Sequence, residues 1–171
     1  MEKGIGRFLL VAVLLAAGVP GTGSSTPASP SGFDKGMRFA TSREGLDQGF
    51  SGAFDFAHLR DLWIRVQVAK LPRTAALHVA LLTPEGRAFY ETSRNFSRLP
   101  EVTLAKPPNA DHEVTVFPAK RIQGGFALDL SVPVAGSIFV RYPSPGVWTV
   151  QARLVETGES LSEKLEVRFT P

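Results

Sequence analysis

Short stretches in which apolar and polar residues alternate recur through most of this chain. The clearest is DLWIRVQVAK, residues 61–70, in which the even-numbered positions from Leu62 to Val68 are all aliphatic. The intervening positions are mostly polar, and Trp63 and Arg65 are among them. Because successive side chains of a β-strand point to opposite faces, this period of two predicts a strand with one face in a core.

The same pattern predicts two hairpins and several shorter strands. Residues 76–92 and 144–169 each contain two alternating runs joined by a turn, TPEG in the first and ETGES in the second. Pro and Gly stand where tight turns need them. Further strands are expected at 112–117, 126–132 and 137–142, with a short one at 102–105 and one in the ambiguous segment 50–62. After residue 24 we find no convincing amphipathic helix.

Closely spaced short strands with Pro and Gly turns are typical of antiparallel sandwiches and barrels. We therefore predict an all-β fold for residues 36–171, an antiparallel β-sandwich of about seven to nine strands. Trp148 is expected in its core, because it shares a strand face with Val150 and Leu154.

A resemblance to a known family supports this fold class. The segments AGSIFVRYPSPGVWTVQARL and EKLEVRF resemble the last strands of immunoglobulin-like and fibronectin-type-III-like domains of secreted bacterial proteins. In those domains a Pro-Gly corner precedes an aromatic residue at the start of the penultimate strand, and Pro145, Gly146 and Trp148 match it. LLTPEGRAFYE resembles their mid-domain hairpin, so the likeness covers about residues 60–171. The resemblance implies that the predicted antiparallel β-sandwich is immunoglobulin-like, and it leaves the function open. The cysteine pair of antibody domains is missing.

The N-terminus has the three parts of a secretory signal peptide. Lys3 and Arg7 precede an uncharged run of 12 residues at 8–19, which is too short to span a bilayer. Gly21 and Gly23 then offer the small residues that a signal peptidase accepts. We predict cleavage near Gly23 and export to the periplasm or the medium; an N-terminal anchor or a buried helix is the alternative. The Ser/Pro/Gly-rich residues 24–35 are expected to be a disordered linker.

Charge and cysteine content exclude several classes of function. Removing residues 1–23 takes away two of the 19 basic and one of the 16 acidic residues, which leaves a net charge of +2. The charges are interspersed, so we expect no nucleic-acid partner, and no membrane span after signal cleavage. The absence of cysteine excludes disulfides, thiol catalysis, thiolate metal sites and an N-terminal lipid anchor.

Few residues indicate catalysis. There is no G-x-S-x-G motif, and the three histidines, His58, His78 and His112, lie in separate segments. His112 lies between two acidic residues, but strand alternation would point those side chains away from it, so we expect no metal site there. We therefore predict a protein that is not an enzyme and carries no cofactor.

Carboxylate pairs leave one catalytic alternative. A small hydrolase could use Asp55 with Asp61, or Glu44 with Asp47, if the two carboxylates of a pair lay about 5–10 Å apart. Nothing in the sequence brings them together, and turn-capping and solubility are the simpler explanation.

Trp63 is the main candidate for ligand binding, with Arg65 beside it and His78 on the following strand. An exposed Trp can stack on a sugar ring or anchor a protein partner. The competing interpretation is that the first segment or a loop covers Trp63 and makes a second small core.

Two functions follow from these features. The first is a non-catalytic, exported protein-interaction or structural module of the cell envelope, which binds an envelope or extracellular protein through residues 94–111 and its edge strands. The alternative is a carbohydrate-binding module that holds a glycan with Trp63 and either Tyr90 or Tyr142.

Overall fold

The computed structural model describes residues 36–48, 53–106 and 111–170. The predicted signal peptide (1–23) and linker (24–35) lie outside the described residues. The described chain is mostly β-structure with two helical turns. In order along the chain the elements are β1 Met37–Ala40, α1 Gly45–Gln48, β2 Ala53–Asp55, β3 Asp61–Val68, β4 Thr74–Leu82, β5 Ala88–Ser97, β6 Thr103–Ala105, β7 Val114–Pro118, β8 Lys120–Ile122, β9 Gly125–Pro133, α2 Ile138–Arg141, β10 Gly146–Leu154 and β11 Ser160–Arg168. In this part of the chain neither helix is long and apolar enough to cross a membrane.

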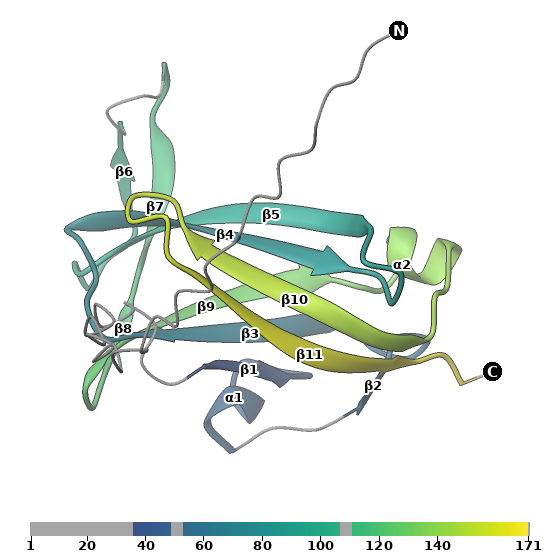
Figure 1. Ribbon diagram of the computed structural model, residues 1–171. Coiled ribbons are helices and arrows are strands. Elements are labelled where there is room, and N and C mark those ends of the chain that lie inside the picture. The colour runs from purple at the N-terminus through teal and green to yellow at the C-terminus, as the bar shows by residue number, and fades with distance from the viewer. Residues whose placement is uncertain (1–35, 49–52, 107–110, 171) are drawn as a thin grey trace, which may run out of the picture.

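The strands form two sheets that face each other (Figure 1). One sheet has four strands in the order β1-β3-β9-β8, and the other has seven in the order β2-β11-β10-β4-β5-β7-β6. Among the described residues there are thus eleven strands, not seven to nine. β1 and β8 fall where no strand was expected. They are four and three residues long, and such short strands are too brief to show alternation in the sequence.

The expectation of purely antiparallel sheets is wrong at two places. β2 pairs with β11 and β5 pairs with β7 in parallel, whereas all other pairs are antiparallel. Both exceptions join strands that are not consecutive along the chain, so no hairpin turn fixes their direction. The four-stranded sheet is antiparallel throughout.

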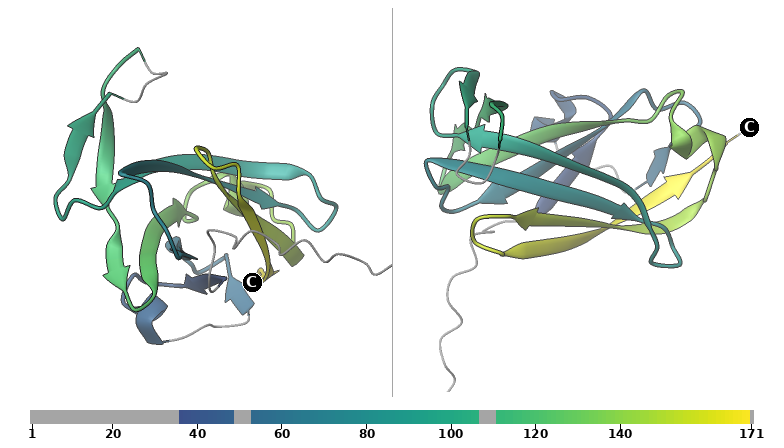
Figure 2. Two further views of the ribbon diagram at one scale, coloured as in Figure 1. Left: turned by 60° about the vertical axis from the view of Figure 1, so that its left-hand side comes forward. Right: turned by 90° about the horizontal axis from the view of Figure 1, so that it is seen from above.

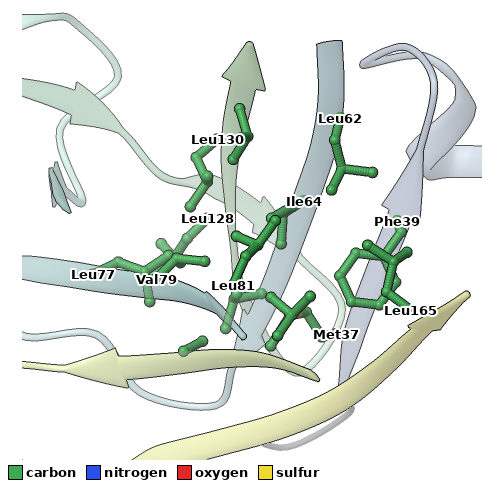
Figure 3. Packing of buried hydrophobic residues seen from close by; sticks show 14 of the residues in the cluster. Met37, Phe39, Leu62, Ile64, Leu77, Val79, Leu81, Leu128, Leu130 and Leu165 are labelled. Atoms are coloured by element: carbon green, nitrogen blue, oxygen red, sulfur yellow. The ribbon is translucent and has the colours of Figure 1, made fainter. Parts of the chain in front are cut away.

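The core lies between the sheets and is built from the rows that alternation predicts. Leu62 and Ile64 of β3, Leu128 and Leu130 of β9 and Leu77 of β4 belong to one buried cluster, and each is at most 1% exposed (Figure 3). Burial of one such side chain stabilises the fold by about 1.5–3 kcal/mol. The two predicted hairpins are confirmed as β4–β5 and β10–β11.

A cluster of aromatic side chains, which we call the aromatic group, lies at one end of the core. Its members are Phe56, Phe89, Tyr90, Phe139, Trp148 and Phe169. Trp148 is 1% exposed, and its indole Nε1 donates a hydrogen bond of 2.7 Å to the carbonyl oxygen of Ser144. Its ring lies 5.8 Å from that of Phe139 and 5.2 Å from that of Phe89, centre to centre. The predicted core position of Trp148 is therefore confirmed.

The strand expected at 137–142 is wrong, because these residues form α2. Ser137 caps the helix by accepting a hydrogen bond from the backbone N–H of Phe139, and Gly136 before it has a φ of 67°. The capping hydrogen bond and the positive φ turn the chain into the helix. Phe139 then packs into the aromatic group, whereas Ile138 and Val140 are each 40% exposed.

β6 and β7 project beyond the body of the sandwich. Figures 1 and 2 show β6 and the first part of β7 projecting past the other strands, whereas the last part of β7 pairs with β5. The short strand expected at 102–105 corresponds to β6, which pairs with β7 antiparallel and ends the seven-stranded sheet. We call β6 and β7 together the arm.

Candidate functional site

A buried ion pair lies on the face of β3 opposite the core row. Arg65 of β3 and Asp129 of β9 are partners in register, and their side chains are 4% and 5% exposed. Nε of Arg65 donates to one carboxylate oxygen at 2.6 Å, and Nη2 donates to the other at 2.8 Å. This two-pronged geometry is the strong form of an ion pair. The hydrogen bonds to Asp129, and then to Asp47, raise the pKa of Arg65 above its ordinary value.

Exposed charges extend this pair towards the surface. Nη1 of Arg65 donates to Asp47 at 2.5 Å, and Lys120 Nζ lies 3.1 Å from both oxygens of the same carboxylate. Hydrogen bonds from Arg65 and then Lys120 hold the pKa of Asp47 below its ordinary value. Nε of Arg43 stands 3.7 Å from Asp129. Asp47 belongs to α1 and Lys120 to β8, so the network ties both elements to β3.

Beside this network is a hollow of about 230 Å³, which we call the cationic hollow. It lies where the chain passes from β7 to β8, that is, from one sheet to the other. Its lining residues are Arg43, Trp63, Arg94, Phe96, Val102, Phe117, Pro118, Lys120, Ala127 and Asp129. Three of the four charged members are positive. A more open hollow next to it shares Arg43, Lys120 and Asp129 and is also lined by Glu44, Asp47 and Arg65.

Arg94 differs from the other cations of the cationic hollow. It is half-buried on β5, its guanidinium lies 4.6 Å from the centre of the Phe117 ring, and among the described residues it makes no ion pair with a carboxylate. Burial, and then the positive charge of Arg43, lower the pKa of Arg94. A half-buried cation beside a second cation is electrostatically unfavourable, and an anion bound in the hollow would relieve this.

An apolar track leads from the arm into the cationic hollow. Leu104 pairs in register with Thr115, and Phe117 lies two residues further along β7, so all three share one face of the sheet. Val102, which lines the hollow, lies two residues before Leu104. Leu104 and Val102 are 66% and 58% exposed, and Leu99 before them is 48% exposed.

The structure brings two of the three predicted site residues together. Trp63 is half-buried and lines the cationic hollow, while Arg65 lies two residues along on the same face, held in its ion pair. His78 is elsewhere, because β3 and β4 belong to opposite sheets and the LPRT turn between them is a crossover. His78 contacts the hydroxyl of Ser93 at 3.1 Å and lines a separate hollow.

The tyrosines considered for glycan binding do not line the cationic hollow. Tyr90 packs against Phe139, with ring centres 5.4 Å apart, in the aromatic group. Tyr142 follows α2 and is 63% exposed. Trp63 is therefore the aromatic candidate for stacking on a sugar in this hollow, because Phe96, which also lines it, is 1% exposed and Phe117 is covered by Arg94.

The carboxylates considered for hydrolysis lie in three different surroundings. Asp55 of β2 accepts hydrogen bonds from the backbone N–H groups of Ala57 and Thr170. Asp61 lies 3.6 Å from Arg60 at the start of β3. Glu44 lines the open hollow beside Asp47. In the described residues no group of three or more His, Asp or Glu is arranged to hold a metal ion.

Sequence reasoning missed Asp129, Arg94, Arg43 and Lys120 as parts of the site. For Asp129 a signal was present in the sequence. Asp129 in FALDLSV and Arg65 in DLWIRVQV are opposite charges in the middle of two predicted strands, and a buried charge needs a partner of opposite sign. The others come from a turn and from strands of both sheets, and only the fold brings them together. No protein-family model matches the chain, and no curated protein matches it in sequence.

Proposed function

We propose that the chain is an exported, non-catalytic, immunoglobulin-like β-sandwich that binds another protein of the cell envelope or of the surroundings. The arm is the proposed contact surface. The observation that carries the proposal is a set of exposed apolar side chains at the open end of a sheet: Leu104 on the arm, and Leu99 and Val102 in the segment that leads into β6. A contiguous patch of exposed apolar side chains often marks an interaction site, whereas single exposed apolar residues are normal on any surface.

Strand order supports the immunoglobulin-like part of the proposal. β1-β3-β9-β8 corresponds to strands A, B, E and D of such domains, and β11-β10-β4 corresponds to G, F and C. β5 and β7 then take the positions that variable-type domains add beyond C. Trp148 lies on β10, in the position of strand F, whereas the buried Trp of antibody domains lies on strand C.

Addition of a partner strand is the mode of binding that the arm favours. β6 pairs with β7 on one side and has no paired neighbour on its other side among the described residues. A free edge presents backbone N–H and C=O groups that a second chain can pair with. Leu104 would then give an apolar contact on one face of the added strand.

Photocross-linking tests this function. A photoreactive amino acid is introduced at Leu104, and, as a matched control, at Val155, which is 52% exposed and lies outside the arm. In the producing cell, residue 104 should yield a reproducible cross-linked partner that residue 155 does not yield. Equal products at both positions, or none at 104, would contradict the proposal.

A glycan is the second candidate ligand, and the position of Trp63 in the cationic hollow favours it. The Trp63→Ala variant should lose binding on a glycan array on which the wild-type protein binds. Binding that persists in this variant would eliminate the mechanism. A tryptophan fluorescence change during titration with polysaccharide supplies a second readout, and buried Trp148 should contribute little to that change.

A further inference from the structure

We propose that the cationic hollow receives a carboxylate side chain from the polypeptide that the arm binds. This inference rests on the proposed function and names the chemistry of the partner: an extended segment that carries an aliphatic and an acidic residue on the same face.

The charge balance of the site supports an anionic guest. Four cations, Arg43, Arg65, Arg94 and Lys120, surround two carboxylates, Asp47 and Asp129, and Glu44 lies only at the neighbouring open hollow. Arg65 already donates hydrogen bonds to the carboxylates of Asp129 and Asp47. Arg94, in contrast, has no carboxylate partner among the described residues. An incoming carboxylate can accept hydrogen bonds from Arg94, and a guanidinium can give two such bonds at once.

The size of the cationic hollow favours one side chain over a whole ligand. Sites for drug-sized molecules have volumes of about 300–1,000 Å³, and this hollow has about 230 Å³. Its wall is largely apolar, with Phe96, Val102 and Phe117 next to the cations. Such a wall suits the methylene groups of an acidic side chain, with the carboxylate at the guanidinium.

The apolar track decides between a peptide and a sugar. Leu104 and Val102 share the face that leads into the cationic hollow, and they offer aliphatic contacts to a side chain two residues away from the acidic one. A strand beside β6 places alternate side chains on that face, about 7 Å apart. An acidic sugar would use Trp63 and Arg94 but would make no comparable use of Leu104.

The test compares two short acetylated peptides of alternating residues, leucine with glutamate and leucine with glutamine. Binding to the full exported chain is followed by NMR chemical shifts, with glucuronate as a third probe. The glutamate peptide should bind on the order of tenfold more tightly than the glutamine peptide, the gain typical of a charged hydrogen bond. Arg94→Gln should remove this preference and Arg94→Lys should keep part of it. Arg153→Gln, a change at an exposed position of β10, should leave this preference intact.

The outcomes separate this inference from the proposed function. Equal binding of both peptides, lost in Leu104→Ser but unchanged in Arg94→Gln, would overturn the inference and leave the arm as a binding surface. Tighter binding of glucuronate than of the glutamate peptide, dependent on Arg94 and indifferent to Leu104→Ser, would overturn it in favour of an acidic sugar. No binding by either peptide would count against both proposals.

Discussion

Arg65 and Asp129 face each other on neighbouring strands and are joined by two hydrogen bonds of 2.6 and 2.8 Å, with both side chains at most 5% exposed. They lie on the face of the four-stranded sheet away from the core. Burial of two charges is costly unless both are fully paired, and here Asp47, Arg43 and Lys120 complete the pairing. The pair therefore fixes the position of α1 and β8 around the cationic hollow.

Loss of one partner of this pair should destabilise the fold strongly. Asp129→Ala leaves Arg65 buried with Asp47 alone, and we expect the free energy of unfolding to fall by about 3 kcal/mol, measured by urea denaturation. Glu166→Ala removes the exposed ion pair with Arg168 and should cost less than about 1 kcal/mol. The double replacement Arg65→Met with Asp129→Leu should recover most of the stability. A loss at Asp129 no larger than at Glu166 would contradict this explanation.

Gly125 is expected to tolerate no side chain. Its φ is 159°, and a Cβ atom there would lie 2.1 Å from the carbonyl oxygen of Val68, on β3. Gly86 has a φ of 79° but open space around its Cβ position, so Gly86→Ala reports the cost of the backbone conformation alone. Gly125→Ala should exceed that cost by about 1–3 kcal/mol in thermal or urea unfolding. If both variants lost the same free energy of unfolding, the backbone near Val68 would be able to move away from the new Cβ atom at little cost, which would contradict this prediction.

Asp55 should contribute to stability in a pH-dependent way. Hydrogen bonds from Thr170, and then from His58, hold the pKa of Asp55 well below its ordinary value. A depressed pKa stabilises the folded state above the unfolded-state pKa, about 3.9, and this stabilisation is lost as the pH falls towards the folded-state value. The melting temperature of Asp55→Asn should therefore be lower than that of the wild type at pH 7, with the difference shrinking below about pH 4. A difference that is constant with pH would indicate that the charge of Asp55 is irrelevant.

Export should remove the first residues of the chain. Mass spectrometry of the protein recovered from the periplasm or the medium is expected to show a new N-terminus close to Gly23. The exported protein should then retain the whole described domain, which begins with β1 at Met37. Retention of Met1 on exported protein would contradict the predicted signal peptide.

The regular strands could be predicted from the sequence because their alternation reports burial directly. Residues 61–70 and 126–132 became β3 and β9, and their aliphatic rows are buried as expected. Alternation failed at Ile138, Phe139 and Val140, where three apolar residues in succession suit a buried strand but a capping Ser137 starts a helical turn instead. It also failed for the short edge strands β1 and β8, whose formation depends on pairing with β3 and β9.

The candidate site could be predicted only in part. Trp63 was identified because it interrupts the polar row of β3, and it lines the cationic hollow. Arg94 comes from β5 of the other sheet and Lys120 from the start of β8. Their proximity depends on the pairing between β5 and β7, which is parallel and has no local sequence signal. His78 was grouped with Trp63 because neighbouring strands in sequence often share a sheet, and here they do not.

Amide hydrogen exchange of the arm tests the central claim most directly. The protein is compared alone and with the partner identified by cross-linking at residue 104. Strand addition should slow exchange at those backbone N–H groups of β6, Thr103–Ala105, that point away from β7. Exchange in β1, at the edge of the four-stranded sheet, should stay unchanged. Unchanged exchange throughout β6 in a saturated complex would contradict the account.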